Sequence, residues 1–410
     1  MNKSKQLWTT VALLNLCIVA LLGVTLRSKI LFPLHGIEFN NILHAHSHFA
    51  FAGWITLSLI TLMVYEIVPE EFNTKRSYNN YLVGFLVTAA GMLVTFLYQG
   101  YGMYSNICNV LFILVTYGFS FVFIKDILKT NTDKAVKTLS ISALICLVLS
   151  SGGPITLAMM MATHSHDNLL YKDSVYTYLH FQYNGFFTLT VFALLLNALY
   201  KNFTEHQLIK VRIFANLVSI SIVPTLFISY LWHYSNPFVY CMAGIGILLI
   251  ITSIVYFFIA LRSIKDHRFT ILPFIRHIGV LSVIAFLLKS LLQTGTIIPS
   301  LGKLVYGDRA IIIGYLHLVL LGFVTLYIIA NFMYSGLIDG TSRFTRYSVR
   351  VFAGAVISNE VILMTQGFGN MLMVSYSIYT WLLWGAAIWL FTGAVMIFIS
   401  RMKTVRKLQH

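Results

Sequence analysis

A five-position pattern that begins with histidine occurs three times in this chain of 410 residues. It reads His-x4-Gly-aromatic-x-Thr-Leu, and its copies begin at His48, His180 and His317, about 135 residues apart. Neutral imidazole binds metal ions and the iron of haem. Because repetition at a regular period predicts a repeated structural unit, we expect the three histidines at equivalent places in the fold.

Two further histidines precede the first copy, so His44, His46 and His48 alternate along one segment. On a helix His44 and His48 share a face, about 6 Å apart along the axis, and His46 points away. Each of the three is a candidate cofactor ligand. Each motif glycine lies a little over one turn beyond its histidine, where a missing side chain lets a flat macrocycle or a neighbouring helix approach. Because the motif occurs three times, and we expect its copies at similar depth in the fold, an approaching macrocycle is favoured over a neighbouring helix.

The composition excludes a water-soluble domain, with 58% hydrophobic residues, 10% charged residues and a mean hydropathy of +0.81. A membrane-spanning helix needs about 20 mostly apolar residues. The sequence predicts twelve such spans, at roughly 7–27, 42–68, 80–99, 104–127, 138–162, 174–200, 209–232, 237–261, 273–296, 310–335, 347–366 and 374–400. The fold class is therefore an all-α membrane protein of twelve helices in three pseudo-symmetric four-helix arcs, in one domain of repeats at roughly 1–135, 136–265 and 266–410.

The net charge of +15 indicates membrane topology and not a nucleic-acid partner. With both termini in the cytoplasm, most of the 28 Lys and Arg residues fall on the cytoplasmic side, as the positive-inside rule requires. We therefore expect a bacterial inner (cytoplasmic) membrane protein with its histidines toward the periplasm. The cations left on the outer side are Arg27, Lys29, Lys172, Lys303 and Arg309.

Other chemistry-bearing residues fall in the same outer half or within the spans. His35, His164, His166 and His233 are outer histidines by this topology. The run Met159-Met-Met161-Ala-Thr-His164-Ser-His166 combines thioethers with imidazoles, which suits copper(I), although an apolar core followed by a polar loop gives the same pattern.

Two charged residues and one proline lie within predicted spans, where they could affect the interior of the protein. Lys289 and Glu360 lie deep in spans 9 and 11, where they could form an ion pair or face a polar channel. Pro154 should bend span 5, and the bend could open room for a flat cofactor or simply aid packing.

Twelve spans in three arcs, with histidines early in spans 2, 6 and 10, resemble subunit I of the haem–copper oxidase and nitric oxide reductase superfamily. The spacing in His46-Ser-His48-x4-Gly53 is also similar to the His-x-His-x4-Gly of the NnrS family, smaller twelve-span relatives that contain haem and copper and are linked to nitric oxide metabolism. His317-Leu-Val-Leu-Leu-Gly322 is similar to a late NnrS segment. The resemblance covers essentially the whole chain and implies a role in respiratory electron transfer or in handling nitric oxide or oxygen.

The resemblance also implies a low-spin haem. In the oxidases one histidine of helix 2 and one of helix 10 bind this haem, so a haem b here would be held by His44, His46 or His48 together with His317.

The second metal centre of the oxidases is matched only in part. Its copper ligands correspond to His180 in helix 6 and to His233 after helix 7, where the oxidases have two adjacent histidines. The histidine that holds the oxygen-binding haem is replaced by Tyr315, although tyrosine can ligate haem iron. The ligand set of an oxidoreductase is thus incomplete, and whether the chain is an enzyme stays open.

The expected partners are membrane lipid, an electron-donor protein or quinol, and further subunits. The alternative function is a copper or other metal transporter that uses the outer histidine and methionine clusters. A conduit needs ligands through the full membrane thickness, and the inner half has almost none. A proton-coupled carrier fits less well, because inverted-repeat carriers have an even number of repeats.

Overall fold

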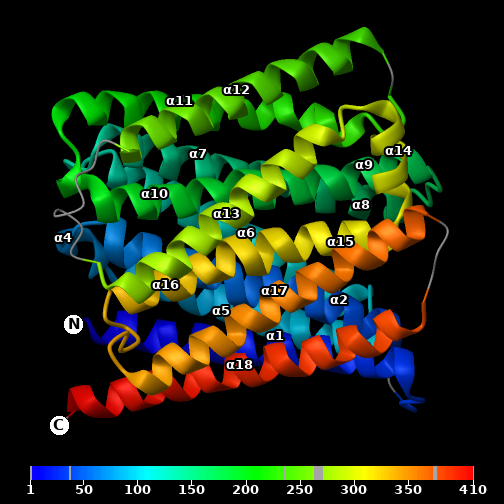
Figure 1. The fold of residues 1–410 in the computed structure, drawn as a ribbon, viewed down its shortest axis with the longest axis horizontal. Coiled ribbons are helices and arrows are strands. Elements are labelled where there is room, and N and C mark those ends of the chain that lie inside the picture. The colour runs from blue at the N-terminus through cyan, green and yellow to red at the C-terminus, as the bar shows by residue number, and fades with distance from the viewer. Residues whose placement is uncertain (1, 37, 235, 263–270, 373–375, 410) are drawn as a thin grey trace.

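The computed structural model describes residues 2–36, 38–234, 236–262, 271–372 and 376–409. In this part of the chain every regular element is a helix, and twelve helices are long and apolar enough to cross a membrane. They lie side by side in one bundle, and both termini lie at the same end of it (Figure 1). We call this end of the bundle the terminal end. The predicted all-α, twelve-helix fold is confirmed.

The spans follow one another with short connections. Spans 1 to 6 are α1 (Lys3–Leu31), α2 (Phe39–Phe49) continued by η1 (Ala50–Thr56), α3 (Leu57–Leu62) and η2 (Met63–Ile67), α5 (Arg76–Gln99), α6 (Met103–Ile127), α7 (Lys134–Ser150) with α8 (Gly152–Ala162), and α9 (Asn168–Leu179) continued by η3 (His180–Phe187) and α10 (Thr188–Leu199). Spans 7 to 12 are α11 (Glu205–Leu226) with η5 (Phe227–Tyr230), α12 (Pro237–Arg262), α13 (Pro273–Gly295), α15 (Arg309–His317) continued by η7 (Leu318–Thr325) and α16 (Leu326–Tyr334), α17 (Arg343–Met371), and α18 (Ile378–Gln409). Short helices α4 (Glu70–Asn73) and α14 (Pro299–Gly307) lie in connections.

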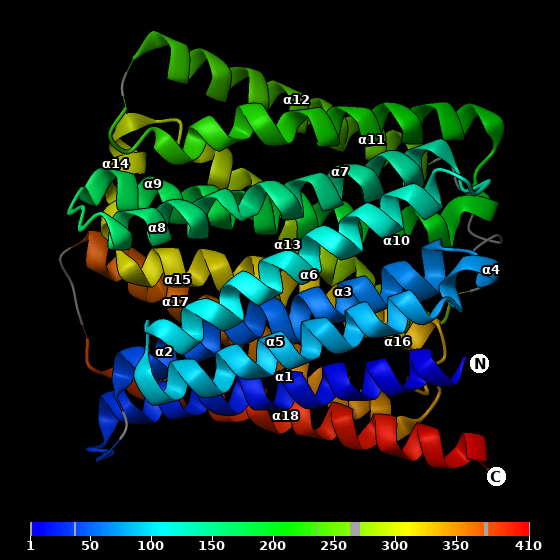
Figure 2. The ribbon, with the colours of Figure 1, turned by 180° about the vertical axis from the view of Figure 1, so that it is seen from behind.

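Neighbouring spans pair along the chain, and the first and last spans also meet. Helices α5 and α6, α11 and α12, and α17 and α18 pack against each other, and α18 returns to lie along α1 (Figure 2). The predicted division into repeats at roughly 1–135, 136–265 and 266–410 stays a prediction.

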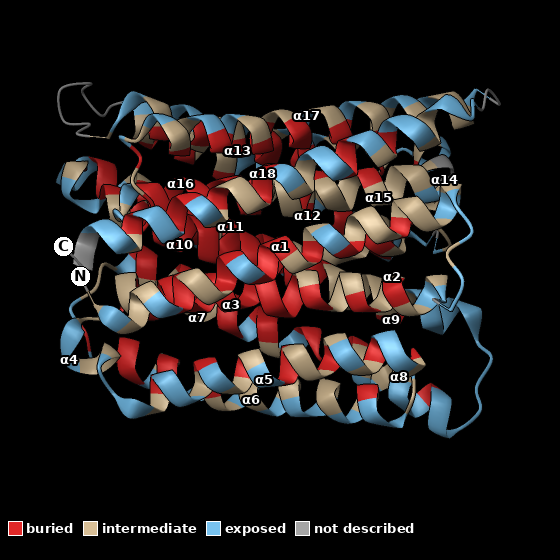
Figure 3. Cartoon of the chain, turned by 90° about the horizontal axis from the view of Figure 1, so that it is seen from below, coloured by how far each residue is buried: buried red, intermediate tan, exposed pale blue. Residues whose placement is uncertain are grey.

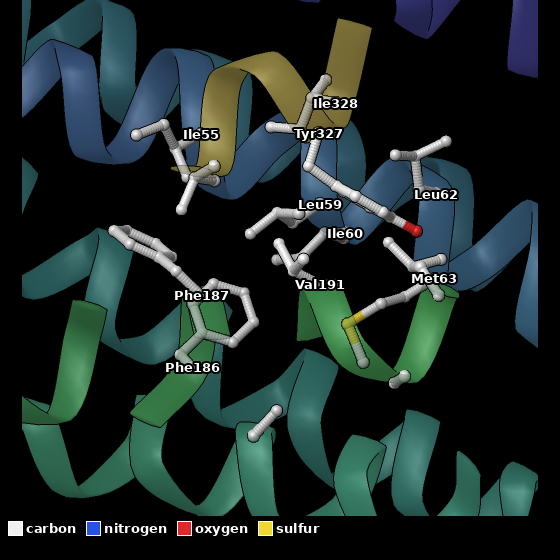
Figure 4. Packing of buried hydrophobic residues seen from close by; sticks show 14 of the residues in the cluster. Ile55, Leu59, Ile60, Leu62, Met63, Phe186, Phe187, Val191, Tyr327 and Ile328 are labelled. Atoms are coloured by element: carbon white, nitrogen blue, oxygen red, sulfur yellow. The ribbon is translucent and has the colours of Figure 1, made fainter. Parts of the chain in front are cut away.

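The three spans that carry the motif form the middle of the bundle. In their apolar windows 89%, 78% and 56% of the residues are buried for spans 2, 6 and 10, against 22% to 44% in the other nine. Buried residues accordingly gather in the centre, and exposed ones cover the outer helices (Figure 3). Side chains of all three spans interdigitate there, among them Ile55 and Met63, Phe187 and Val191, and Tyr327 and Ile328 (Figure 4).

Each copy of the motif folds as a π-helical turn within its span. These turns are η1, η3 and η7, and each contains the motif glycine. A π-helix bonds residue i to i+5, which widens the helix and leaves carbonyl groups that need other donors. Two such donors come from neighbouring spans, since Asn15 donates to the carbonyl of Gly53 at 2.7 Å and Ser282 to that of Phe323 at 2.7 Å. The sequence predicted the repetition but not the widened turn.

Two of the three motif glycines serve helix packing, which corrects the expectation that they face a macrocycle, and Gly53 lies against the ring of Phe49 in its own span. A Cβ at Gly185 would lie 2.5 Å from Cβ of Cys146 on α7, and one at Gly322 would lie 3.2 Å from Cβ of Ala285 on α13. Only a residue without a side chain lets the widened turn approach its neighbour this closely.

Two charged side chains, the partly exposed Glu66 and the buried Arg401, link spans at the terminal end. Glu66 accepts hydrogen bonds from Lys5 at 3.1 Å, Asn331 at 3.1 Å and Ser335 at 2.5 Å, which joins spans 1, 2 and 10. Arg401 is fully buried and donates to the carbonyls of Leu337 and Gln6 and to the hydroxyl of Thr10.

Candidate metal centre

The three histidines of α2 face two different environments. His44 and His48 both face Tyr101, with ring centroids 4.5 Å and 5.8 Å from it, and His48 stacks on Phe96 at 4.4 Å. The hydroxyl of Tyr101 is 2.9 Å from Nε2 of His48. His46 turns away toward α1, as the spacing predicts.

His46 is held by one ring nitrogen only. Its Nδ1 is 3.1 Å from the carbonyl oxygen of Val19, and its Cε1 lies close to Gly23, where a Cβ would be 3.4 Å away. A carbonyl only accepts, so Nδ1 carries the proton and Nε2 keeps its lone pair. Nε2 has no hydrogen-bond partner among the described residues.

His317 repeats this arrangement on span 10. Its Nδ1 is 2.8 Å from the carbonyl oxygen of Ile313, one turn earlier in the same helix, so its Nε2 is likewise a free lone pair within the described structure. Histidine that ligates a metal usually donates its other N–H to a carbonyl or carboxylate, which fixes the tautomer and the ring orientation. His46 and His317 are near enough for their charges to interact, and both are only partly buried. The structure therefore brings together two imidazoles in the ligand tautomer.

Arg27 lies beside this pair, and Arg309 lies beside Arg27. Arg27 on α1 is near enough to interact electrostatically with His46, with His317 and with Arg309 at the start of α15. Neither arginine forms an ion pair with an acidic side chain in the part of the chain that the structure describes. Two like charges without a counterion are suited to binding an anionic group.

The other expected outer cations lie elsewhere. Lys29 donates to the carbonyl of Leu34, and Lys172 lies 4.7 Å from the ring centroid of Trp232. The side chain of Lys303 is outside the described residues.

Glu360 and Lys289 do not pair, which corrects the ion-pair expectation. Glu360 accepts a hydrogen bond from Asn359 at 3.2 Å, and its Oε2 is buried without a partner in the described structure. Lys289 is buried and donates to Oδ1 of Asn184. The two charges lie on different helices, α17 and α13, and each has its own amide neighbour.

His180 differs from His46 and His317 in the hydrogen bonding of its ring nitrogens. Its Nε2 is 2.8 Å from the carbonyl oxygen of Ile222, and its Nδ1 accepts from the amide of Asn184 at 3.1 Å. Lys289 in turn donates to the same Asn184. His180 is 0% exposed, and both ring nitrogens are engaged. The ring offers no lone pair to copper unless one of these bonds breaks.

The remaining sequence-predicted metal residues are dispersed. Nε2 of His233 is 3.2 Å from a carboxylate oxygen of Asp173, and His164 and His166 are exposed beyond α8. Among the described residues no three His, Cys, Asp or Glu side chains are grouped so that they could hold a metal ion.

The side chain of Tyr315 already has partners within the protein. Its hydroxyl donates to Gln293 at 3.3 Å, and its ring meets that of Tyr183 edge to face at 5.7 Å. A cavity of only about 20 Å³ lies beside Lys289 and Gln293, which is room for one water and not for a porphyrin. The residues present therefore do not fit a second haem with copper.

Sequence reasoning missed Asn184. It stands immediately before the motif glycine, where the other two copies have Ala52 and Leu321. A polar residue at this one position was the available signal that the second copy is different.

Comparison with known proteins gives the fold. No protein-family description matches the sequence, and no curated protein matches it either. Among solved structures, a heme-copper terminal oxidase dimer determined by cryo-EM is similar over 98% of this chain and 84% of that chain, with a TM-score of 0.63 and 14% sequence identity. The chain has the haem–copper oxidase fold. At this identity the likeness concerns the fold alone, so function has to come from the residues.

Proposed function

We propose that this membrane protein binds one haem b between His46 and His317 and transfers electrons in a respiratory membrane. One observation supports the proposal above all others: both imidazoles donate Nδ1–H to a backbone carbonyl and leave Nε2 free. The oxidase fold supplies the second reason, because helices 2 and 10 hold the low-spin haem in the superfamily that the chain resembles.

The chain's own residues would position the group. His46 and His317 would hold the iron through their free Nε2 atoms, and Gly23 leaves room for the ring of His46 against α1. Arg27, which interacts with both imidazoles, and Arg309, which interacts with Arg27, would neutralise the propionates. A haem bound in this way supplies reversible one-electron transfer.

The same residues favour electron transfer over gas chemistry. If both imidazoles held the haem, the protein would supply both ligands and leave none to be provided by oxygen or nitric oxide. The second centre, where the oxidase superfamily reduces its substrate, is occupied here by His180, Asn184 and Lys289 in a closed hydrogen-bonded chain. We therefore do not include copper in the proposal.

The proposed location is the bacterial inner membrane, with both termini in the cytoplasm and the haem toward the periplasmic side. The distribution of Lys and Arg supports this orientation. Electrons would come from a donor protein or from quinol.

The test is an optical and EPR spectrum with metal analysis of protein purified from haem-replete cells. We expect about one iron per chain, sharp α and β bands on reduction, and a low-spin ferric signal with two histidine ligands. His46→Ala and His317→Ala should lose the haem, and His44→Ala should keep it. His317→Met should keep a haem but raise its midpoint potential, because methionine stabilises ferrous iron. Colourless wild-type protein without iron would contradict the proposal.

A further inference from the structure

A cavity near the histidine cluster lies on the other side of α2 from His46. It has a volume of about 570 Å³ and is walled by α2, α6, α8 and α9. Span 5 is broken between Ser150 and Gly152, and Pro154 lines the cavity just beyond the break. The sequence left open whether a bend there makes room for a flat cofactor or aids packing, and the structure has a cavity beside it.

The cavity opens toward the lipid. Met159, Met161 and Val110 line it and are 63%, 53% and 53% exposed, although they lie in membrane-spanning helices. Exposed apolar side chains of such helices face acyl chains, so a ligand would enter sideways from the bilayer. Most of the lining is apolar, which selects a lipid-soluble ligand.

Polar groups collect along the wall formed by α2, α6 and α9. The amides of Asn106 and Asn109 and the hydroxyl of Tyr178 line the cavity and have no hydrogen-bond partner among the described residues. The hydroxyl of Tyr101 and Nε2 of His48 form a further polar pair there. These groups supply several N–H and O–H donors that face an otherwise apolar space.

These donors argue against an acyl chain as the occupant. A hydrocarbon would leave the amides and the phenol unpaired in an apolar environment, which is unfavourable for each group. A flat ring that carries carbonyl or hydroxyl oxygens pairs with them and also fills the apolar remainder. The volume lies within the range of about 300–1,000 Å³ that is usual for small-molecule sites.

We propose that this cavity, bounded by His48, Tyr101, Asn109 and Met161, is a binding site for a lipid-soluble molecule of the quinone class. The site stands independently of the haem, because none of its lining residues belongs to the His46–His317 pair. It is nevertheless adjacent to that pair, since His46 and His48 lie on the same helix and point to opposite sides. A single helix, about 10 Å across with its side chains, therefore separates the cavity from the His46–His317 pair.

The experiment uses the full chain in nanodiscs of synthetic dioleoyl-phosphatidylcholine, which contain no quinone. Equilibrium binding of decylubiquinone is measured by filtration, and a photoreactive azido-benzoquinone maps the contact by mass spectrometry. We expect saturable binding, with labelling confined to peptides that contain Asn106–Ile113 or Pro154–Ala162. Asn109→Leu removes a donor, and Ala158→Phe fills the cavity, so each should weaken binding by about tenfold or more.

The matched control is Leu114→Phe, which adds a ring to α6 at a position that is 58% exposed and does not line the cavity. It should bind as wild type does, and all three variants should keep the wild-type melting temperature. Equal affinity in all variants, labelling spread over the lipid-facing helices, or a tightly held phospholipid that quinone does not displace would each overturn the site. The optical spectrum is recorded on the same samples: quinone binding without haem would leave this inference intact and end the proposed function, and haem without quinone binding would do the reverse.

Discussion

Trp54 donates its indole N–H to the hydroxyl of Thr325 at 2.9 Å, across 271 residues of sequence. Both residues belong to the repeated motif, Trp54 as the aromatic position of the first copy and Thr325 as the threonine of the third. Both are buried, at 1% and 0% exposure. The motif thus encodes a contact between its own copies at the middle of the bundle.

Loss of this bond should destabilise the protein measurably. Trp54→Phe removes the donor and leaves the hydroxyl of Thr325 unpaired, which should cost about 1–3 kcal/mol. Thermal unfolding in detergent measures the effect. Thr325→Val is the complementary change, and because the two residues form one bond, the double variant should lose less than the sum of the single losses. Additive losses would show that the bond contributes nothing of its own.

Arg401 should be among the most sensitive positions at the terminal end. Its guanidinium is fully buried and bonded to the carbonyls of Leu337 and Gln6. Arg401→Met leaves these carbonyls unpaired where the first and last spans meet, and should destabilise by about 2–4 kcal/mol. The control Arg406→Met changes an exposed cation on the same helix and should alter the melting temperature little. Equal effects of the two changes would contradict this role of Arg401.

His180 should matter for stability and not for cofactor content. His180→Ala leaves the carbonyl of Ile222 and the amide of Asn184 with fewer partners in a closed site, at about 1–3 kcal/mol. The haem spectrum should be unchanged, in contrast with His317→Ala. Copper analysis of the wild type after dialysis against copper should show no stoichiometric metal. Stoichiometric copper that disappears in His180→Ala would establish the ligand role that the bonded ring argues against.

Arg27 should raise the midpoint potential of the proposed haem. Removing a positive charge close to the iron favours the ferric form, so Arg27→Leu should lower the midpoint potential, by about 1–2 kcal/mol of oxidation free energy. Redox titration of the α band measures this shift. Lys29→Leu is the control, since Lys29 is bonded to the carbonyl of Leu34 and has no shown interaction with either imidazole. A potential that is the same in both variants would contradict the proposed propionate contact.

Acid should weaken one contact at the terminal end. Hydrogen bonds from Thr341, together with Lys407, hold the pKa of Asp339 below its usual value of 3.8. A carboxyl whose folded pKa is depressed stabilises the protein above its unfolded value and loses this contribution as the pH falls through the folded value. Asp339→Asn should therefore reduce the loss of stability on acidification below about pH 4. Melting temperatures are measured against pH for wild type and Asp339→Asn. If the contact were unimportant, both melting temperatures would fall in parallel as the pH is lowered.

The sequence by itself determined the membrane fold. Twelve apolar stretches and a motif repeated in spans 2, 6 and 10 were enough for the helix number, because burial of apolar side chains in lipid needs only length and composition. The same reading identified His317 and the α2 histidines as candidate ligands. It could not choose among His44, His46 and His48, since all three have the same chemistry.

Only the tertiary structure decided what each imidazole can do. The state of a histidine is set by the partners of its two nitrogens, and for His46 and His180 one partner comes from a distant segment, the carbonyl of Val19 and that of Ile222 respectively. The same motif therefore presents a free Nε2 in span 10 and a fully bonded ring in span 6. The cavity beside α2 likewise depends on how neighbouring helices pack, which no local pattern contains.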